Sequence, residues 1–240
     1  MPSKKVKEKQ TTQEQQTQPE KKIVNFVTSG IKEIDDAFGK GLPVPGVYLV
    51  LGPPGSGKTP FCLAFASENA KAGKRVLYLC TNNFPEELIR IGKEIGYDVS
   101  NVVFIDSYSW LVGKKADEYV GSLANLSNYL EKIENLLKEE ESEVVVLDTL
   151  STLYLYHDSK EVAKFLQMFA ALIKCGNDCA LIALEAGTTS ESDVKTAEYL
   201  TDGTFLIENR TINITRTPGI RVLQNKLRFE ITPKGIIIKK

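Results

Sequence analysis

Short apolar runs alternate with amphipathic segments along the middle of the chain. Five runs rich in Val, Leu and Ile have the length and composition of strands buried on both faces. They cover residues 47–51, 75–80, 102–106, 144–147 and 180–184. Four further segments, 60–71, 85–95, 123–140 and 160–174, fit helices, and the last spaces its apolar residues three and four apart. This alternation predicts right-handed crossovers and a mostly parallel central sheet flanked by helices, which is an α/β fold.

The pattern changes after Asp202. Five short apolar runs follow closely on one another, and Pro218-Gly219 and Pro233-Lys234-Gly235 supply turn chemistry between them. The runs cover residues 203–208, 211–215, 220–223, 227–232 and 236–240. We expect them to form C-terminal antiparallel strands.

The first 22 residues contain almost nothing to bury. Only Met1 and Val6 are apolar, and six Lys stand against three Glu, a net charge of +3. Because so polar a segment cannot offset its ordering entropy, we expect residues 1–22 to be a disordered tail and residues 23–240 to form one folded domain. The tail is either a solvated extension without a specific role or an electrostatic tether for an acidic protein partner.

The charge of the remaining chain argues against several classes of protein. The whole chain has 30 Lys+Arg and 31 Asp+Glu, so without the tail 24 basic and 28 acidic residues remain, or −4. Such a domain has no global basic field for nucleic acid or an anionic membrane. No apolar run reaches eighteen residues, and four Cys are too few for a disulfide scaffold. The first residues also lack the apolar core of a secretory signal, so we expect a cytoplasmic protein with no membrane contact.

A glycine-rich loop joins the run 47–51 to the helix 60–71. It reads Gly52-Pro53-Pro54-Gly55-Ser56-Gly57-Lys58-Thr59 and satisfies G-x-x-x-x-G-K-[ST] in the strand–loop–helix context that this motif requires. The glycines allow positive φ values that turn backbone N–H groups inward, and the helix adds its dipole, so the loop forms an anion nest. Lys58 is expected to reach the β- and γ-phosphates of a nucleotide, and the Thr59 hydroxyl to bind Mg²⁺.

A second metal ligand is predicted at the end of another strand. The run 144–147 continues into Asp148, which is the pattern of a Walker B strand whose carboxylate holds Mg²⁺ through a water. Alone this pattern is weak, because buried strands often end in an Asp that caps a helix. Together with the glycine-rich loop it makes Asp148 a candidate metal ligand beside Thr59.

Three segments resemble the RecA/RadA/KaiC ATPases, and most of all archaeal single-domain KaiC-like proteins. They are the lead-in 27–35 with the turn Gly41-Leu42-Pro43, the segment 148–153 (Asp-Thr-Leu-Ser-Thr-Leu), and the ending 229–236 (Phe-Glu-Ile-Thr-Pro-Lys-Gly-Ile). The resemblance covers residues 24–240. It implies a RecA-like P-loop fold that binds ATP with Mg²⁺ at a subunit edge. It also implies a ring or filament, as a homo-oligomer or as a hetero-oligomer with a related subunit.

The chain departs from the family pattern at two places beside the expected nucleotide. Family members carry an acidic pair after the strand that follows the P-loop helix, and alignment on Pro85 places that pair at Asn82 and Asn83. An amide can orient a water but cannot accept its proton, and losing a general base costs about 10²–10⁴ in rate. Pro60 has no N–H for the α-phosphate, although Pro also suits a first helical turn. We therefore expect weakened binding and slow hydrolysis.

Two further residues are candidates for catalysis. Family members present Lys-x-Arg from a neighbouring subunit, and the nearest counterpart, Thr215-Arg216-Thr217, keeps one basic residue. Arg216 is therefore the candidate trans-acting cation, and the alternative is a solvated Arg on a strand. Glu185 follows the run 180–184, at the edge where RecA-type folds place their γ-phosphate sensor, and is a candidate relocated base. Phosphates repel a carboxylate there unless a cation intervenes.

Two other features give little support to a metal site or a DNA site. Cys175 and Cys179 flank a predicted turn and lack further ligands, so buried structural thiols are the better interpretation. The segment 187–196 occupies the place of a RecA DNA-binding loop. It contains Glu191 and Asp193 but only one Lys, and it has no aromatic residue. Binding single-stranded DNA needs basic side chains and aromatic side chains on which the bases stack.

We therefore expect a KaiC-like P-loop protein that binds Mg-ATP, hydrolyses it slowly or not at all, and acts as a regulatory or assembly component. The alternative is an active ATPase, similar to RecA/RadA paralogues, that works on DNA in repair or recombination. Protein kinase activity like that of KaiC has less support, because the sequence shows no second ATPase domain and no evident phosphoacceptor tail.

Overall fold

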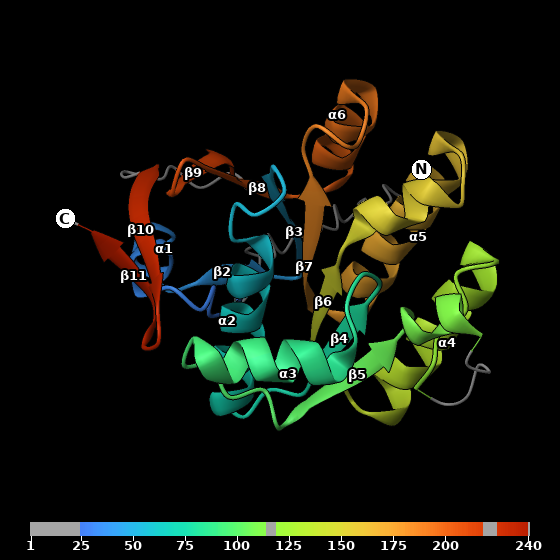
Figure 1. Cartoon of the computed structure of the whole chain (residues 1–240), viewed down its shortest axis with the longest axis horizontal. Helices are drawn as coiled ribbons and strands as arrows, with labels where there is room; N and C mark the ends of the chain where they lie inside the picture. The colour runs from blue at the N-terminus through green and yellow to red at the C-terminus, as the bar shows by residue number, and fades with distance from the viewer. Residues whose placement is uncertain (1–24, 114–118, 218–224, 240) are drawn as a thin grey trace, which may run out of the picture.

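The computed structural model describes residues 25–113, 119–217 and 225–239, and within them the chain forms a nine-stranded and a two-stranded sheet. The strands of the large sheet are β3 (Gly46–Gly52), β4 (Val76–Cys80), β5 (Val102–Asp106), β6 (Val144–Asp148), β7 (Cys179–Glu185), β8 (Gly203–Glu208), β9 (Thr211–Arg216), β10 (Lys226–Thr232) and β11 (Gly235–Lys239). Their order is β11-β10-β9-β8-β3-β7-β6-β4-β5 (Figure 1). The six strands from β8 to β5 pair in parallel, and the other three extend the sheet antiparallel. The predicted fold class is confirmed.

The expected strands agree closely with the observed ones, with two differences. Each of the five predicted parallel strands is present within one residue of its expected ends. β8 was expected among the antiparallel strands, but it pairs in parallel with β3 and antiparallel only with β9. The antiparallel part of the sheet therefore begins at β9, one strand later than expected. The strand expected at 220–223 and the tail 1–22 lie outside the described residues. The two-stranded sheet, β1 (Asn25–Val27) with β2 (Leu42–Val44), was not anticipated.

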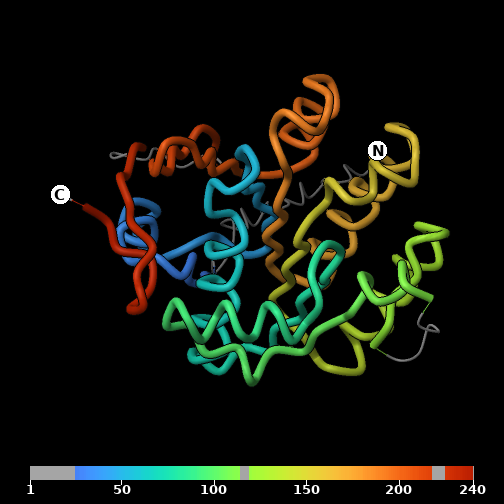
Figure 2. Tube along the Cα trace, in the orientation of Figure 1, coloured from blue at the N-terminus to red at the C-terminus, as the bar shows by residue number. Residues whose placement is uncertain are grey.

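Helices cover both faces of the large sheet (Figure 2). On one face lie α1 (Lys32–Ala37), α2 (Lys58–Lys71) and α3 (Pro85–Glu94), and on the other α4 (Leu126–Glu139), α5 (Ser159–Gly176) and α6 (Glu191–Leu200). Two short 3₁₀ segments, η1 (Ser109–Val112) and η2 (Leu150–Leu155), follow β5 and β6. In β3, Tyr48 and Val50 join the first core, whereas Val47 and Leu49 join the second. Burial on both faces explains why the strands are continuous apolar runs.

Side-chain caps fix where the helices on the second face begin. Asp158 accepts hydrogen bonds from two backbone N–H groups at 2.9 Å and starts α5. Asn125 accepts from the N–H of Asn128 at 3.0 Å, so α4 begins at Leu126 and not at residue 123. The boundary was missed because apolar spacing continues through Leu123, which packs into the same core without being helical.

The segment 187–196 is a loop only in its first part, contrary to the sequence-based expectation. Ser190 accepts a hydrogen bond from the N–H of Asp193 at 3.1 Å, and its hydroxyl donates to the Asp193 carboxylate at 2.6 Å. This capping pair starts α6 at Glu191. The acidic residues that suggested a poor DNA-binding loop are therefore the first turn of a helix, where they complement its dipole.

The six parallel strands bring the candidate residues to one edge of the sheet. β3, β7, β6 and β4 are consecutive in the sheet, and all four end at the same carboxyl edge. The glycine-rich loop, Asn82, Asp148 and Glu185 follow or end these strands. Ligands of open α/β sheets bind in the crevice outside the carboxyl ends of the strands, so this edge is the place to look for a site.

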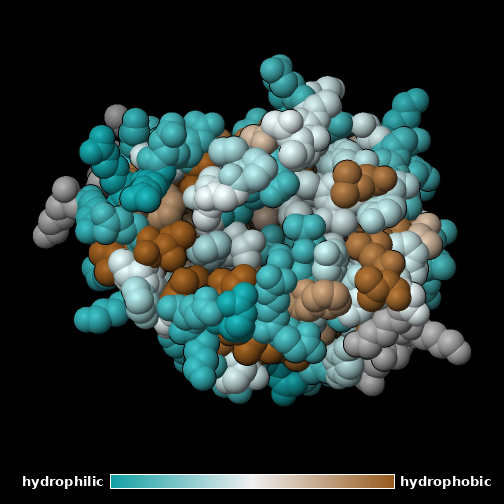
Figure 3. Space-filling view, viewed as in Figure 1, coloured by the Kyte–Doolittle hydropathy of each residue, from teal (hydrophilic) through white to brown (hydrophobic). Residues whose placement is uncertain are grey.

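The outer surface of the described residues is mixed in character. On the face seen in Figure 3, hydrophobic side chains form separate patches among hydrophilic ones. No helix within residues 25–113, 119–217 and 225–239 is long and apolar enough to cross a membrane.

Candidate functional site

The glycine-rich loop lies between the end of β3 and the start of α2. Gly55 and Gly57 have φ values of 73° and 107°, a region that L-residues with side chains rarely adopt. Gly57 is the N-cap of α2 and supplies no side-chain cap, so the first N–H groups of the helix remain available to a ligand. Pro60 is the third residue of α2, where a missing N–H breaks no helical bond. The loop therefore presents donors and a positive helix end to the pocket.

Lys58 folds back over this loop. Its side chain is only 6% exposed, and Nζ donates hydrogen bonds to the backbone oxygens of Gly52 at 3.0 Å and Pro53 at 2.9 Å. Nζ also lies 3.6 Å from Oε1 of Glu185, which is 27% exposed. Burial lowers the pKa of Lys58, and the carboxylates of Glu185 and Asp148 oppose that shift. The ammonium group is thus held between two carbonyls and a carboxylate at the centre of the pocket.

Asp148 ends β6 at the bottom of the pocket and is 5% exposed. Its Oδ2 accepts a hydrogen bond from the hydroxyl of Tyr78 at 2.7 Å, and its carboxylate also interacts with the Thr59 side chain. Burial raises the pKa of Asp148, while the hydrogen bonds from Tyr78 and Thr59 and the charge of Lys58 oppose the increase. Both predicted metal ligands, Thr59 and Asp148, are therefore brought together. Tyr78 was missed because nothing in the sequence of β4 reveals which face each side chain takes.

An open pocket of about 280 Å³ connects these groups. It is lined by residues of the glycine-rich loop and the start of α2 and by residues at the ends of four other strands: Gly55, Gly57, Lys58, Thr59, Pro60, Asn82, Asp148, Thr149, Glu185 and Ile231. Asn82 therefore lines the pocket that holds Lys58 and Asp148. Asn83 does not line this pocket, and its amide donates to Oε2 of Glu87 in α3 at 3.3 Å. The structure separates the two Asn residues that the sequence treated as a pair.

A second cavity of about 530 Å³ adjoins the glycine-rich loop, and Glu230 is among the residues that line it. Gly55 and Ile231 border both cavities, and Arg210, Phe229 and Ser56 line the second. The Ser56 hydroxyl is buried and has no hydrogen-bond partner among the described residues. Arg210 sits in the β8–β9 turn with a φ of 56°. Sequence analysis missed Arg210, because only the sheet topology carries this hairpin to the loop.

Arg216 lies apart from both cavities. Its guanidinium donates hydrogen bonds to the backbone oxygens of Glu198 and Thr201, at the C-terminal end of α6 in the same chain. A cation at this position complements the negative end of the helix dipole. In the single chain, Arg216 thus stabilises a helix end, and its assignment as a trans-acting cation stays a prediction.

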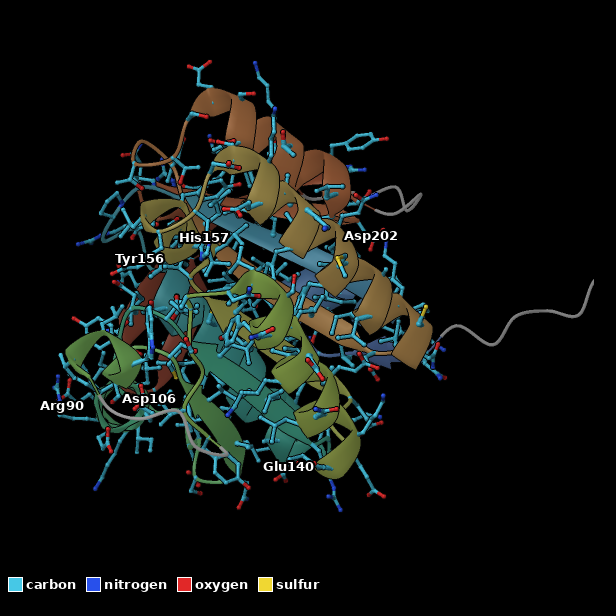
Figure 4. All side chains as sticks on the ribbon, turned by 90° about the vertical axis from the view of Figure 1, so that its right-hand side faces the viewer. Arg90, Asp106, Glu140, Tyr156, His157 and Asp202 are labelled. Carbon is cyan, nitrogen blue, oxygen red and sulfur yellow. The ribbon has the colours of Figure 1, made fainter. Side chains whose placement is uncertain are left out.

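In the described part of the chain, the cysteines and the single His do not gather into a metal site. Cys62, Cys80 and Cys179 are buried, whereas Cys175 is exposed, which corrects the expectation that both members of the 175/179 pair are buried. His157 Nε2 lies 2.7 Å from the backbone oxygen of Leu123 and ties α5 to the segment before α4 (Figure 4). Within the described ranges, no group of three or more His, Cys, Asp or Glu could hold a metal ion.

Comparisons with known proteins agree with this geometry. The family model described as "ATPase: KaiC" matches residues 27–240. A UPF0273 protein of Pyrococcus horikoshii is 24% identical over 232 residues, covering 88% of this chain and 93% of that protein. The DNA repair protein RadA of Aquifex aeolicus is 23% identical over 223 residues, but this chain spans only 45% of its length.

A solved structure supports the fold independently. The crystal structure of a KaiC-like protein from the hyperthermophilic archaeon Pyrococcus horikoshii aligns with a TM-score of 0.75 and 20% sequence identity. The alignment covers 91% of this chain and 100% of that one. The resemblance to RecA/RadA/KaiC proteins is confirmed, and the family match extends over nearly all of the described residues. The chain therefore belongs to the KaiC ATPase family.

Proposed function

We propose that this protein binds Mg-ATP at the carboxyl edge of the sheet, hydrolyses it slowly or not at all, and acts as a regulatory or assembly component. The observation that carries the proposal is the position of Lys58. A nearly buried ammonium lies at a glycine-rich loop, in a pocket that Thr59, Asp148 and Asn82 also line, and the family resemblance assigns Asn82 the position of a catalytic carboxylate. This arrangement suits phosphate binding better than proton abstraction.

The residues present fit both the phosphates and the metal. Free N–H groups at the start of α2 and the inward-facing loop favour an anion, and the buried Ser56 hydroxyl lacks a partner among the described residues. Lys58 would exchange its carbonyl partners for phosphate oxygens. Thr59 and Asp148 would hold Mg²⁺, directly and through a water, and the ion would neutralise phosphate charge when bound.

The second cavity suits the remainder of a nucleotide. It adjoins the phosphate pocket through Gly55 and Ile231, and it is lined by Phe229 and by the Arg210 side chain. We assign the base and ribose to this cavity, with apolar contacts from Phe229 and Ile231. Arg210 would interact with the ribose or the α-phosphate and would partly replace the donor that Pro60 lacks.

Slow hydrolysis follows from the groups that surround the expected γ-phosphate. Asn82 can position a water but cannot take its proton. Glu185 is the carboxylate in the pocket that could do so, but it is paired with Lys58 at 3.6 Å. The Glu185 carboxylate would have to leave Lys58 before it could contact a water beside the γ-phosphate.

The same Glu185 favours one alternative, an active ATPase that works on DNA. If the carboxylate leaves Lys58 when nucleotide binds, it stands in the pocket as a candidate base. The match to a protein named for DNA repair adds a reason to test DNA. Oligomers of identical or related subunits are part of both proposals, since Arg216 can act in trans only from a neighbouring copy.

The decisive experiment measures binding and turnover together. Titration calorimetry with ATP and Mg²⁺ should show one site per chain that Lys58→Ala weakens at least tenfold. Steady-state hydrolysis, with and without single-stranded DNA, should remain far below about 1 s⁻¹, the low end of ordinary enzyme rates. Turnover near that rate would overturn slow hydrolysis, and stimulation by DNA would favour the alternative. Absence of ATP binding at millimolar concentration would reject the proposal. Sedimentation with and without ATP tests the oligomer.

A further inference from the structure

A groove lies at the amino ends of the parallel strands, at the opposite end of β7 from the nucleotide pocket. Its volume is about 470 Å³, and it lies between the last turns of α4 and α5 and the starts of β6 and β7. α4 and α5 pack against each other on this face of the sheet, and Glu140, the residue after α4, is labelled in Figure 4. We call it the amino-edge groove.

The groove is electrostatically suited to a cation. It is lined by Glu134, Glu141, Glu143 and Asp178 against a single Lys138. The carbonyl ends of two helices, which carry partial negative charge, border it as well.

Ion pairs satisfy three of these four carboxylates. Glu134 pairs with Lys138, Glu143 with Lys74 and Glu141 with Arg75. Asp178 has no cationic partner among the described residues, and burial together with Glu143 raises its pKa to about 6. The uncompensated carboxylate of the groove is therefore Asp178.

The groove also has a buried polar group without a partner among the described residues and an apolar wall. Ser142 lines it and is 5% exposed, and the Ser142 hydroxyl is buried without a hydrogen-bond partner among the described residues. Leu137 and Leu172 supply apolar wall beside the carboxylates. A lysine side chain has the matching character, because its methylene stem packs on apolar surface while its ammonium reaches a carboxylate.

The beginning of the described chain lies close to this groove. Asn25 lies opposite Val44 in the β1–β2 pair, and the N–H of Gly46, two residues further on, donates to the backbone oxygen of Asp178 at 3.1 Å. Asn25 therefore lies within roughly 15 Å of the groove. Lys21 and Lys22 precede it by only three to four residues, a reach of roughly 10–14 Å before the side chain is added.

We propose that the amino-edge groove binds the lysine-rich segment 1–22 of the same molecule, with Lys21 or Lys22 paired to Asp178. The charges agree, because the segment carries six Lys and three Glu. The groove shares no lining residue with the nucleotide pocket, so this proposal can be tested independently of ATP binding.

The exposed thiol of Cys175 lines the groove and reports on its occupancy. In the full chain at low salt, Cys175 should react with a disulfide reagent three to ten times more slowly than in the variant Lys21→Gln/Lys22→Gln. High salt should bring the wild-type rate up to that of the variant. The matched control, Lys195→Gln/Lys234→Gln, removes two exposed lysines elsewhere and should react like wild type. Cys62, Cys80 and Cys179 are buried and should not contribute.

Carbodiimide cross-linking provides a second measurement. It should join Lys21 or Lys22 to Asp178 or Glu143, and Asp178→Asn should remove the first of these products. In a mixture of isotopically light and heavy protein, the cross-links should join residues of one molecule only. Equal Cys175 reactivity in all three proteins overturns the proposal, and so does equal acceleration in the control variant. Mixed light–heavy cross-links overturn docking within one molecule and assign the segment to a second copy.

Discussion

Replacing Glu185 by Gln separates the two roles that its carboxylate can have in the pocket. In the present geometry Glu185 holds Lys58 at 3.6 Å and faces the place proposed for the γ-phosphate. The amide keeps the size of the side chain but removes its charge. We expect Glu185→Gln to bind ATP more tightly than wild type, because a negative charge near the phosphates disappears and Lys58 loses its competing partner.

The magnitude follows from Coulomb's law. Two unit charges at 3.6 Å interact by about 1 kcal/mol in water and about 4–5 kcal/mol at an effective dielectric constant of about 20. A phosphate charge roughly 6 Å from the carboxylate gives a repulsion of about 0.7–3 kcal/mol over the same range. Part of the Lys58 attraction persists in the bound state. We therefore expect a net gain of about 1–2 kcal/mol, which is a fivefold to thirtyfold lower Kd.

Titration calorimetry of the full chain with ATP and Mg²⁺ measures this change. Glu87→Gln is the matched control, since Glu87 accepts a hydrogen bond from Asn83 and does not line the pocket. Its Kd should equal that of wild type, and adenosine, which has no phosphate, should bind all three proteins alike. An unchanged or higher Kd for ATP in Glu185→Gln would refute the electrostatic reasoning. A hundredfold fall in any residual hydrolysis would identify Glu185 as the base.

Four further changes have defined outcomes. Asn82→Glu should raise ATP hydrolysis at least tenfold in a phosphate-release assay, and no rise would mean that another group is missing. Asp148→Asn should remove the Mg²⁺ dependence of ATP binding and, because burial raises the pKa of Asp148, raise the Tm of the ligand-free protein by a few degrees at pH 7. Arg210→Ala should weaken ATP binding about tenfold, whereas Arg210→Lys should retain much of it. The folded pKa of Asp178 is about 6 against 3.8 ordinarily, so the contribution of Asp178 to the free energy of unfolding is largest below pH 4 and is lost as the pH rises through 6. In the Lys21→Gln/Lys22→Gln protein, Asp178→Asn should therefore stabilise by about 1–2 kcal/mol at pH 7 and by nothing at pH 4, measured by urea unfolding.

Local signals predicted the parts of the fold that depend on neighbours in sequence. The parallel strands were found within one residue because burial on both faces makes each a continuous apolar run. The start of α6 was missed because Ser190 and Asp193 are equally common in loops and in helix caps. The direction of β8 was also missed, since a strand's sequence carries no information on whether its partner is parallel.

In the candidate site, too, the sequence predicted the local features and missed the contacts between distant segments. The spacing of Gly52, Lys58 and Thr59 specifies a phosphate-binding loop, because backbone conformation and the helix that follows are local properties. The ion pair of Lys58 with Glu185 depends on the pairing of β3 with β7, and the hydrogen bond from Tyr78 to Asp148 on the pairing of β4 with β6. The separation of Asn82 from Asn83 is likewise visible only in the folded chain.

The sequence by itself therefore determined the class of protein, the P-loop and its expected ligand, since these reside in contiguous residues. Only the tertiary structure placed Arg210 beside the loop, held Arg216 at the end of α6 and left Asp178 uncompensated near the start of the described chain. Charges act through space, and the sheet order sets which of them meet. Residues more than a hundred positions apart, such as Lys58 and Glu185, become partners only because β3, which leads into the loop before Lys58, pairs with β7, which ends at Glu185.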